Sequence, residues 1–402
     1  MSIGDRVMEL PKAVELTGDG EPKTYALVSH ESAVEAIWAL ASRNWRDVLD
    51  DEGIWLVPSP QNCVKTQGEA KRLAAEVDLE ALGIRRTPID LLVPNKSCYS
   101  RGKRAKFHVW GDFFAPHSFV RVHDRVLVST PYFVSLQLAM ACRVDRLSRE
   151  EARRIEEEDA RLRTELGIEP RGLTADELVR WGNIERLVRA TQVICDFMGT
   201  YRYVPGKGDG GTDIMYQTKP LVTPETLEAY LRDMGSVRGI ERARNVAALA
   251  FPKAASPMET MLPLMLSLPV EMGGFALPRP QLNHEVNVGP EVRELSSQET
   301  MFADLCWPEH MVLAEYYGWD DHFGAGASKV ASDADRANSL TSLGWTVFHV
   351  TFEQVRTLEG VSLLARQVAH ALGVSLPEPT EAQLVWRSRL LSMLLPSSRR
   401  RL

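Results

Sequence analysis

The residues best suited to chemistry are Asp304 and Glu315, two carboxylates on either side of a short turn at Pro308 to His310. The flanking runs, 300 to 306 and 311 to 317, have the composition of strands, so together they predict a hairpin. Asp304 and Glu315 lie about equally far along the chain from the middle of the turn, so they should be opposite each other in the hairpin. Side chains of such a pair that share a face have Cβ atoms about 4.5 to 5.5 Å apart. Two carboxylates at that distance repel by roughly 3 kcal/mol, so Mg2+ between them is the natural way to keep both ionised. The alternative is a register shifted by one residue, which would turn one carboxylate to solvent.

The elements that must position this pair follow from capping and hydrophobic patterns. Ser256 to Glu259 has the spacing of a capping box and predicts the start of an apolar helix, and a strand follows at 281 to 288. After the hairpin, Ser332 to Asp335 predicts a second helix that ends at Gly344, and 345 to 351 is an apolar strand. The order helix, strand, hairpin, helix, strand indicates an α/β core with a mixed central sheet.

Three segments of this core, SPMET, ADLCWPEHMVLAEYYG and DADRANSLTSLGWTVFHVT, resemble the restriction-endonuclease-like PD-(D/E)XK fold, and Vsr-like nuclease domains in particular. The resemblance covers about residues 256 to 372. In that family a glutamate from the first helix joins a strand aspartate and a following acid at the metal site. The resemblance therefore implies catalytic roles for Glu259, Asp304 and Glu315, with Mg2+ or Mn2+ as cofactor. The capping box alone also explains Glu259.

The chain departs from the family at the catalytic lysine, which would stand two residues after Glu315, where this sequence has Tyr317. A lysine there orients the attacking water and stabilises negative charge, which tyrosine does poorly. Lys329 or Arg336 is the candidate replacement, although a solvated lysine and an arginine paired with Asp333 are the simpler interpretations. His322 is similar in position to the histidine that follows the hairpin in Vsr-like enzymes, and it is also readable as a polar loop residue.

A second feature is a basic segment. Residues 85 to 125 carry nine Lys and Arg against three Asp, a net charge of +6, within a chain whose net charge is -7. Arg101, Lys103, Arg104 and Lys106 lie among aromatic residues, a combination typical of nucleic-acid contact. A solvated basic loop is the alternative. The run from Ile89 to Ala139 resembles the strand-rich segment of AbiEi-family antitoxin-like proteins, although no winged helix is evident ahead of it.

Length and composition limit the remaining possibilities. The chain has 402 residues, 44% hydrophobic and 25% charged, with five dispersed cysteines and no CxxC pair. These values are typical of a folded cytoplasmic protein that has no disulfide framework, no Cys-based zinc site and no membrane segment. We expect an AbiEi-like α+β domain at 1–195, a loop and helical connector at 196–255, the nuclease-like domain at 256–376, and a C-terminal helix with a basic tail at 377–402. Within the first domain, the run from Arg146 to Arg163 should be a solvated helix with weak ion pairs.

Two functions follow from these features. The first is a Mg2+-dependent DNA endonuclease that acts in phage defence or a toxin–antitoxin setting. The second is a non-catalytic antitoxin-like protein that binds nucleic acid and keeps only a degenerate nuclease fold. DNA is the expected partner of both, together with a toxin or defence protein.

Overall fold

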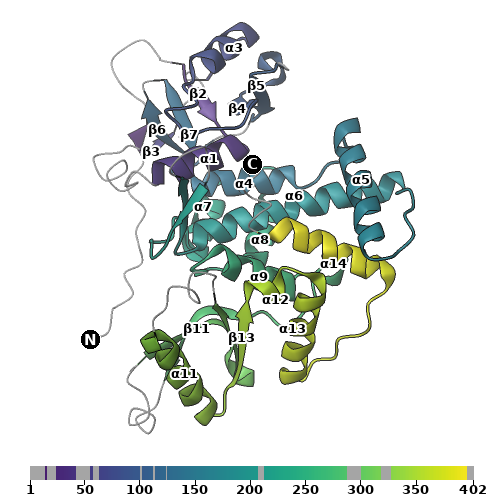
Figure 1. The fold of residues 1–402 in the computed structure, drawn as a ribbon. Coiled ribbons are helices and arrows are strands. Elements are labelled where there is room, and N and C mark those ends of the chain that lie inside the picture. Colours follow the sequence, from purple (N-terminus) through teal and green to yellow (C-terminus); the bar gives the residue numbers. More distant parts are fainter. Residues whose placement is uncertain are drawn as a thin grey trace. The chain divides into compact units, whose positions relative to one another are not determined.

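The computed structural model describes residues 14–15, 24–41, 55–57, 63–99, 102–111, 114–123, 125–206, 212–287, 300–317 and 327–395 (Figure 1). The chain forms two compact units. Unit 1 comprises Met1–Ala141, Arg202–Met215 and Leu221–Ala248. Unit 2 comprises Cys142–Tyr201, Tyr216–Pro220 and Leu249–Leu402. Both units contain helices and mixed sheets, which confirms the predicted α/β class.

Unit 1 is built on a seven-stranded mixed sheet with the order β1-β3-β6-β7-β2-β4-β5. Its strands are β1 (Val14–Glu15), β2 (Ala26–Val28), β3 (Trp55–Val57), β4 (Ile89–Val93), β5 (Ala105–Val109), β6 (Phe119–His123) and β7 (Val126–Ser129). The pairs β2–β7 and β4–β5 are parallel, whereas β2 and β4 are antiparallel. Two of the strands lead directly into helices, β2 into α1 (His30–Ala41) and β7 into α4 (Pro131–Ala141). Pro131 occupies the first helical position, as expected.

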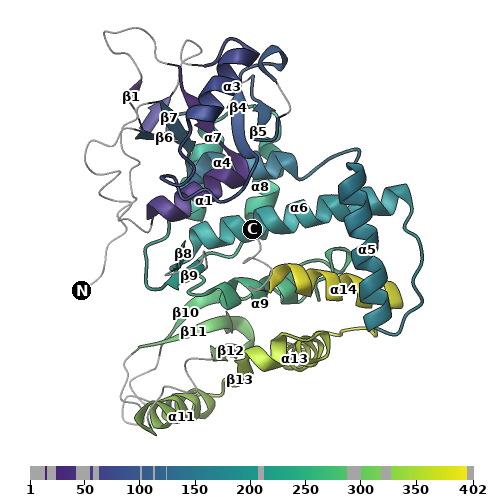
Figure 2. The same cartoon turned by 45° about the horizontal axis from the view of Figure 1, so that its top comes forward.

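The remaining elements of unit 1 are helices and a small hairpin. They are α3 (Gln67–Glu76), the 3-10 turn η2 (Lys96–Cys98), β8 (Arg202–Pro205), β9 (Thr212–Met215), α7 (Pro224–Asp233) and α8 (Ile240–Leu249, whose last residue falls in unit 2). Helix α3 contacts β2 and β4, and β4 lies beside β5 in Figure 2. All five residues of β4, including Asp90, are buried, so this strand forms part of the core.

Unit 2 combines a helical group with a four-stranded sheet. Its helices are α5 (Arg149–Glu165), α6 (Ala175–Met198), α9 (Pro257–Ser267), α11 (Ala327–Ser342), α12 (Phe352–Val355), α13 (Leu358–Ala371) and α14 (Glu381–Leu394), with 3-10 turns η3 (Val270–Met272) and η4 (Pro308–His310). The sheet has the order β10-β11-β12-β13, from β10 (Gln281–Asn287), β11 (Thr300–Trp307), β12 (Val312–Tyr317) and β13 (Thr346–Thr351). The first three strands are antiparallel neighbours, and β12 and β13 are parallel.

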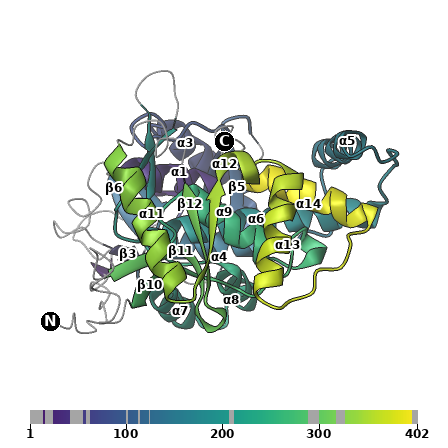
Figure 3. The ribbon, with the colours of Figure 1, turned by 60° about the horizontal axis from the view of Figure 1, so that its bottom comes forward.

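The sheet of unit 2 contacts two helices, one that precedes its strands in the sequence and one that connects two of them. Helix α9 contacts β11, and α11, the crossover between β12 and β13, contacts β13 (Figure 3). Leu340 of α11 packs with Cys306, Leu313 and Met301 in a buried cluster. Helix α11 begins at Ala327, five residues before the predicted cap at Ser332, so Ser332 lies inside the helix.

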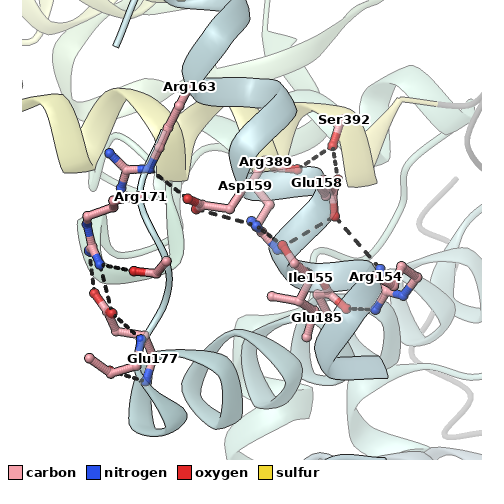
Figure 4. Close-up of polar contacts among 12 residues, drawn as sticks. Arg154, Ile155, Glu158, Asp159, Arg163, Arg171, Glu177, Glu185, Arg389 and Ser392 are labelled. Carbon is pink, nitrogen blue, oxygen red and sulfur yellow. Dashed lines mark hydrogen bonds and ion pairs between the residues drawn. The ribbon is translucent and has the colours of Figure 1, made fainter. Parts of the chain in front are cut away.

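The charged run from Arg146 to Arg163 is not the fully solvated helix that its composition predicts. It forms α5, which buries Ile155, Asp159 and Arg163. The fully buried Arg389 of α14 lies 3.6 Å from a carboxylate oxygen of Asp159 and 3.3 Å from one of Glu185 on α6 (Figure 4). These contacts hold α5 and α6 against the C-terminal helix.

The observed division therefore differs from the predicted boundaries. Residues 142–201 belong to unit 2 rather than to the N-terminal unit, and 221–248 belong to unit 1. The reason is packing between elements that are distant in sequence, such as α5 and α14, which no local pattern reveals.

Candidate functional site

The carboxylate pair lies on the hairpin formed by β11 and β12. Leu305 pairs with Ala314, so the same register extended by one residue sets Asp304 opposite Glu315, as the turn arithmetic predicts. The backbone N–H of Tyr316 donates a hydrogen bond to Asp304 Oδ2 at 2.7 Å. Glu315 is 9% exposed, so neither the shifted register nor a solvated Glu315 is observed.

Glu259 lies in the first turn of α9, where Ser256 caps the helix by accepting a hydrogen bond from the Glu259 N–H at 3.2 Å. The Glu259 carboxylate turns back past the cap. Its Oε2 accepts from the Ala255 N–H at 2.8 Å and from Asn283 Nδ2 at 2.7 Å. Burial raises the pKa of Glu259. Glu259 therefore takes part in the start of α9 and also contacts the sheet, through Asn283 of β10.

Glu259 and Glu315 both act on the carboxyl group of Asp304. Burial, then the charges of Glu259 and Glu315, raise the pKa of Asp304 to about 8. The hydrogen bond from Tyr316 and the charge of Arg336 oppose this rise without cancelling it. Burial and two neighbouring carboxyl groups therefore make the ionised form of Asp304 costly, a cost that a bound proton or cation would relieve.

Among the described side chains, Arg336 brings a positive charge to this cluster. Its Nη2 lies 2.8 Å from Glu315 Oε1 and also donates to the backbone carbonyl of Phe302. The predicted alternative partner, Asp333, has no described side chain, and neither does Lys329, although both lie in α11. His322 falls outside the described residues.

Tyr317 occupies the position that the resemblance assigns to a lysine. Its hydroxyl lies 3.0 Å from His349 Nδ1, on the neighbouring parallel strand. His349 is the register partner of Glu315, so it lies beside that residue on the neighbouring strand. The sequence analysis did not single out His349 or Asn283. The only available signal for His349 was its polar position within the apolar run WTVFHVT.

The donor set fits a hard cation held by two carboxylates. Mg2+ is commonly bound through one or two carboxylates, with water and substrate phosphate completing its coordination. Asp304 and Glu315 are the residues that would hold it. Among the residues that the structure describes, no group of three or more His, Cys, Asp and Glu side chains is arranged to hold a metal ion. A metal ion held by Asp304 and Glu315 would therefore take its remaining ligands from water and substrate.

The basic segment of unit 1 serves partly structural purposes. Arg104 donates to the carbonyls of Ala74, Ala75 and Val77 at 3.0 to 3.3 Å, which caps the C-terminal end of α3. Lys103 is exposed, and Lys106 Nζ lies 4.0 Å from Asp90 Oδ1. Arg101 lies outside the described residues.

No protein-family profile matches the chain, and no solved structure matches it. The chain is similar to two proteins of Mycobacterium tuberculosis, named uncharacterized protein Rv2248 (strain ATCC 25618 / H37Rv) and uncharacterized protein MT2308 (strain CDC 1551 / Oshkosh). Each is 30% identical over 133 residues, which is 33% of this chain and 43% of the relative. The match thus spans less than half the length of either relative. Within the described residues, no helix has the length and apolar character needed to cross a bilayer.

Proposed function

We propose that unit 2 is a Mg2+- or Mn2+-dependent phosphodiesterase that cleaves DNA. The observation that carries this proposal is the register of β11 and β12, which sets Asp304 opposite the buried Glu315, with Arg336 2.8 Å from the Glu315 carboxylate. The raised pKa of Asp304, caused by burial and then by Glu259 and Glu315, accords with this arrangement. The arrangement of α9, three antiparallel strands, α11 and a parallel fourth strand supports the resemblance to the PD-(D/E)XK fold.

The roles of the residues follow from their contacts. Asp304 and Glu315 would hold the metal, which when bound supplies Lewis-acid polarisation of the phosphate and an activated water. Glu259 adds negative charge beside Asp304 and is fixed by Ala255 and Asn283. Arg336 would stabilise charge on the phosphate in the transition state, in place of the family's lysine. Lys103 and Lys106 would position DNA through unit 1.

A non-catalytic, nucleic-acid-binding protein is the second candidate, and a specific observation favours it. Arg336 already neutralises part of Glu315, and Tyr317 is hydrogen-bonded to His349 where a lysine would activate water. A degenerate nuclease fold would keep these contacts after losing its metal. The AbiEi-like resemblance of unit 1 and a toxin or defence partner belong to this candidate as well as to the first.

Cleavage assays separate the two candidates. Purified protein is incubated with single- and double-stranded DNA and RNA in Mg2+, Mn2+ or EDTA, beside Asp304→Asn, Glu315→Gln and the exposed-carboxylate control Glu309→Gln. We expect metal-dependent DNA cleavage by the wild type and the control, and loss of at least about 100-fold in the two site variants. Equal cleavage by all four proteins would refute the assigned site. No cleavage by any, with DNA binding retained, would favour the second candidate.

A further inference from the structure

One buried arginine of unit 2 lacks the carboxylate partner that the other buried arginines have. Among the described residues, the buried arginines are Arg163, Arg387 and Arg389. Arg163 and Arg389 both pair with Asp159. The Nε of Arg387, by contrast, is buried without a hydrogen-bond partner, and no described carboxylate forms an ion pair with its guanidinium. An arginine stays charged in proteins, and a buried charge is costly unless it is paired, so Arg387 requires a counter-charge.

The guanidinium of Arg387 is held in place by an aromatic ring. Its Cζ lies 4.3 Å from the centroid of Phe275, which is 3% exposed. The backbone N–H of Phe275 donates to the carbonyl of Met265 in α9 at 3.1 Å. Gly273, with φ of 93°, lets this segment approach α14 closely, because a Cβ at that position would lie 2.3 Å from the carbonyl oxygen of Trp386. The ring attracts the cation without supplying a negative charge, so Arg387 is positioned but not neutralised.

A second arginine adds to the positive charge. Arg366 of α13 is exposed, and α13 contacts α14 (Figure 3). Burial, then the charge of Arg366, lower the pKa of Arg387, and the charge of Glu378 opposes them. Glu378 is exposed in the segment between α13 and α14, and within the described residues neither it nor Arg366 forms an ion pair. Two positive charges against one negative charge leave this place with a net positive charge.

We infer that Arg387 and Arg366 form a binding site for a phosphate-type oxyanion at α13 and α14. An anion bound there supplies the counter-charge that Arg387 lacks. Each guanidinium can donate two parallel hydrogen bonds, so two arginines suit a tetrahedral phosphate group, whereas a carboxylate offers only two oxygens and is filled by one arginine. Because Nε of Arg387 is enclosed, its Nη atoms are the donors to the anion, and the exposed Arg366 completes the site.

Calorimetric titration of the full chain at pH 7 and constant ionic strength tests the inference. The probes are inorganic sulfate, thymidine 5′-monophosphate, a dinucleoside phosphate of thymidine, and acetate as a carboxylate. All titrations contain EDTA, so the outcome does not depend on the metal chemistry proposed for unit 2. We expect saturable binding of sulfate and of at least one ester, and binding of acetate that is weaker by about tenfold or more. Tighter binding of the monoester would identify a free nucleotide or a 5′ end as the ligand, and tighter binding of the diester would identify the nucleic-acid backbone.

Three variants and a matched control assign the binding to this site. Arg366→Gln should weaken the binding of sulfate about tenfold. Arg387→Met removes the buried charge but keeps an unbranched side chain that can pack on Phe275, and it should abolish saturable binding. Glu378→Gln removes a negative charge that repels the anion, so it should strengthen binding several-fold. The control Arg356→Gln changes an exposed arginine just after α12 and should bind sulfate as the wild type does.

Thermal unfolding provides a second measurement. At matched ionic strength, sulfate should raise the Tm of the wild type and of Arg356→Gln more than that of Arg387→Met, because the general stabilising effect of sulfate is common to all three proteins. The inference is overturned if neither sulfate nor an ester binds saturably, if acetate binds as tightly as sulfate, or if Arg366→Gln binds sulfate with wild-type affinity. Arg366 is exposed, so its variant tests the site even if a substitution at the buried Arg387 affects folding.

Discussion

Asp304→Asn should stabilise the metal-free protein while it removes the proposed metal site. In the folded protein, burial and the charges of Glu259 and Glu315 raise the pKa of Asp304 from 3.8 to about 8. A carboxyl group with a raised pKa binds its proton more tightly when folded, so its ionisation removes stability as the pH rises from about 4 to about 8. At pH 7 this corresponds to an upper limit of about 4 kcal/mol in the free energy of unfolding, taking 1.36 kcal/mol per pKa unit.

Asparagine keeps the shape of the side chain and an oxygen that can accept the hydrogen bond from Tyr316. In EDTA at pH 7, urea denaturation should therefore show the variant to be more stable than the wild type, by up to about 4 kcal/mol. The difference should shrink as the pH falls towards 4 and vanish below about pH 3, where Asp304 is neutral in both the folded and the unfolded wild-type chain. Glu309→Gln, which changes an exposed carboxylate in the turn of the same hairpin, is the matched control and should have little effect.

Added Mg2+ should reverse the order. A cation that binds only the folded wild type stabilises it by about 2.7 kcal/mol at a concentration of one hundred times its Kd, and Asp304→Asn should gain little. The reasoning fails if Asp304→Asn is less stable than wild type in EDTA at pH 7, or if Mg2+ stabilises both proteins equally.

The other predictions concern buried and capping groups. Arg389→Ala should lower the free energy of unfolding by about 3 to 5 kcal/mol, because it removes a fully buried guanidinium from Asp159 and Glu185, whose other partners are Arg163 and Arg154. Arg153→Ala, which breaks an exposed pair with Glu157, should have little effect, and equal losses in urea denaturation would contradict this. Arg104→Ala should cost about 1 kcal/mol by removing the donors that cap α3, and an unchanged urea midpoint would show that the cap contributes nothing. Burial, then His108, lower the pKa of His30 well below 6.5, so the folded state resists its protonation and stability should fall by about 1 kcal/mol between pH 6.5 and pH 5.5. His30→Asn tolerates the left-handed backbone and should lose that dependence, and a variant that retains it would assign the effect to another group.

Much of the candidate site could be anticipated from the sequence because it depends on local geometry. A short turn fixes the register of a hairpin, and the register fixes Asp304 opposite Glu315. A serine three residues ahead of Glu259 fixes the start of α9 at Pro257.

Other features could not be anticipated because they join residues that are distant in the sequence. The composition of α5 indicates a solvated helix, yet Arg389 is more than 200 residues away from Asp159 and buries it. Similarly, Arg104 belongs to a basic run that predicts phosphate contact, but its guanidinium is held by the end of α3, about 30 residues earlier.

The sequence by itself determined the elements of the hairpin, their register and the presence of paired carboxylates, since turns, caps and alternation act over a few residues. Only the tertiary structure decided that Arg336 neutralises Glu315, that His349 contacts Tyr317 and that His30 stacks on His108. These contacts depend on which strands become neighbours and on how helices pack against them. Packing of that kind is set by burial of apolar surface over the whole chain, and it is not written in any one segment.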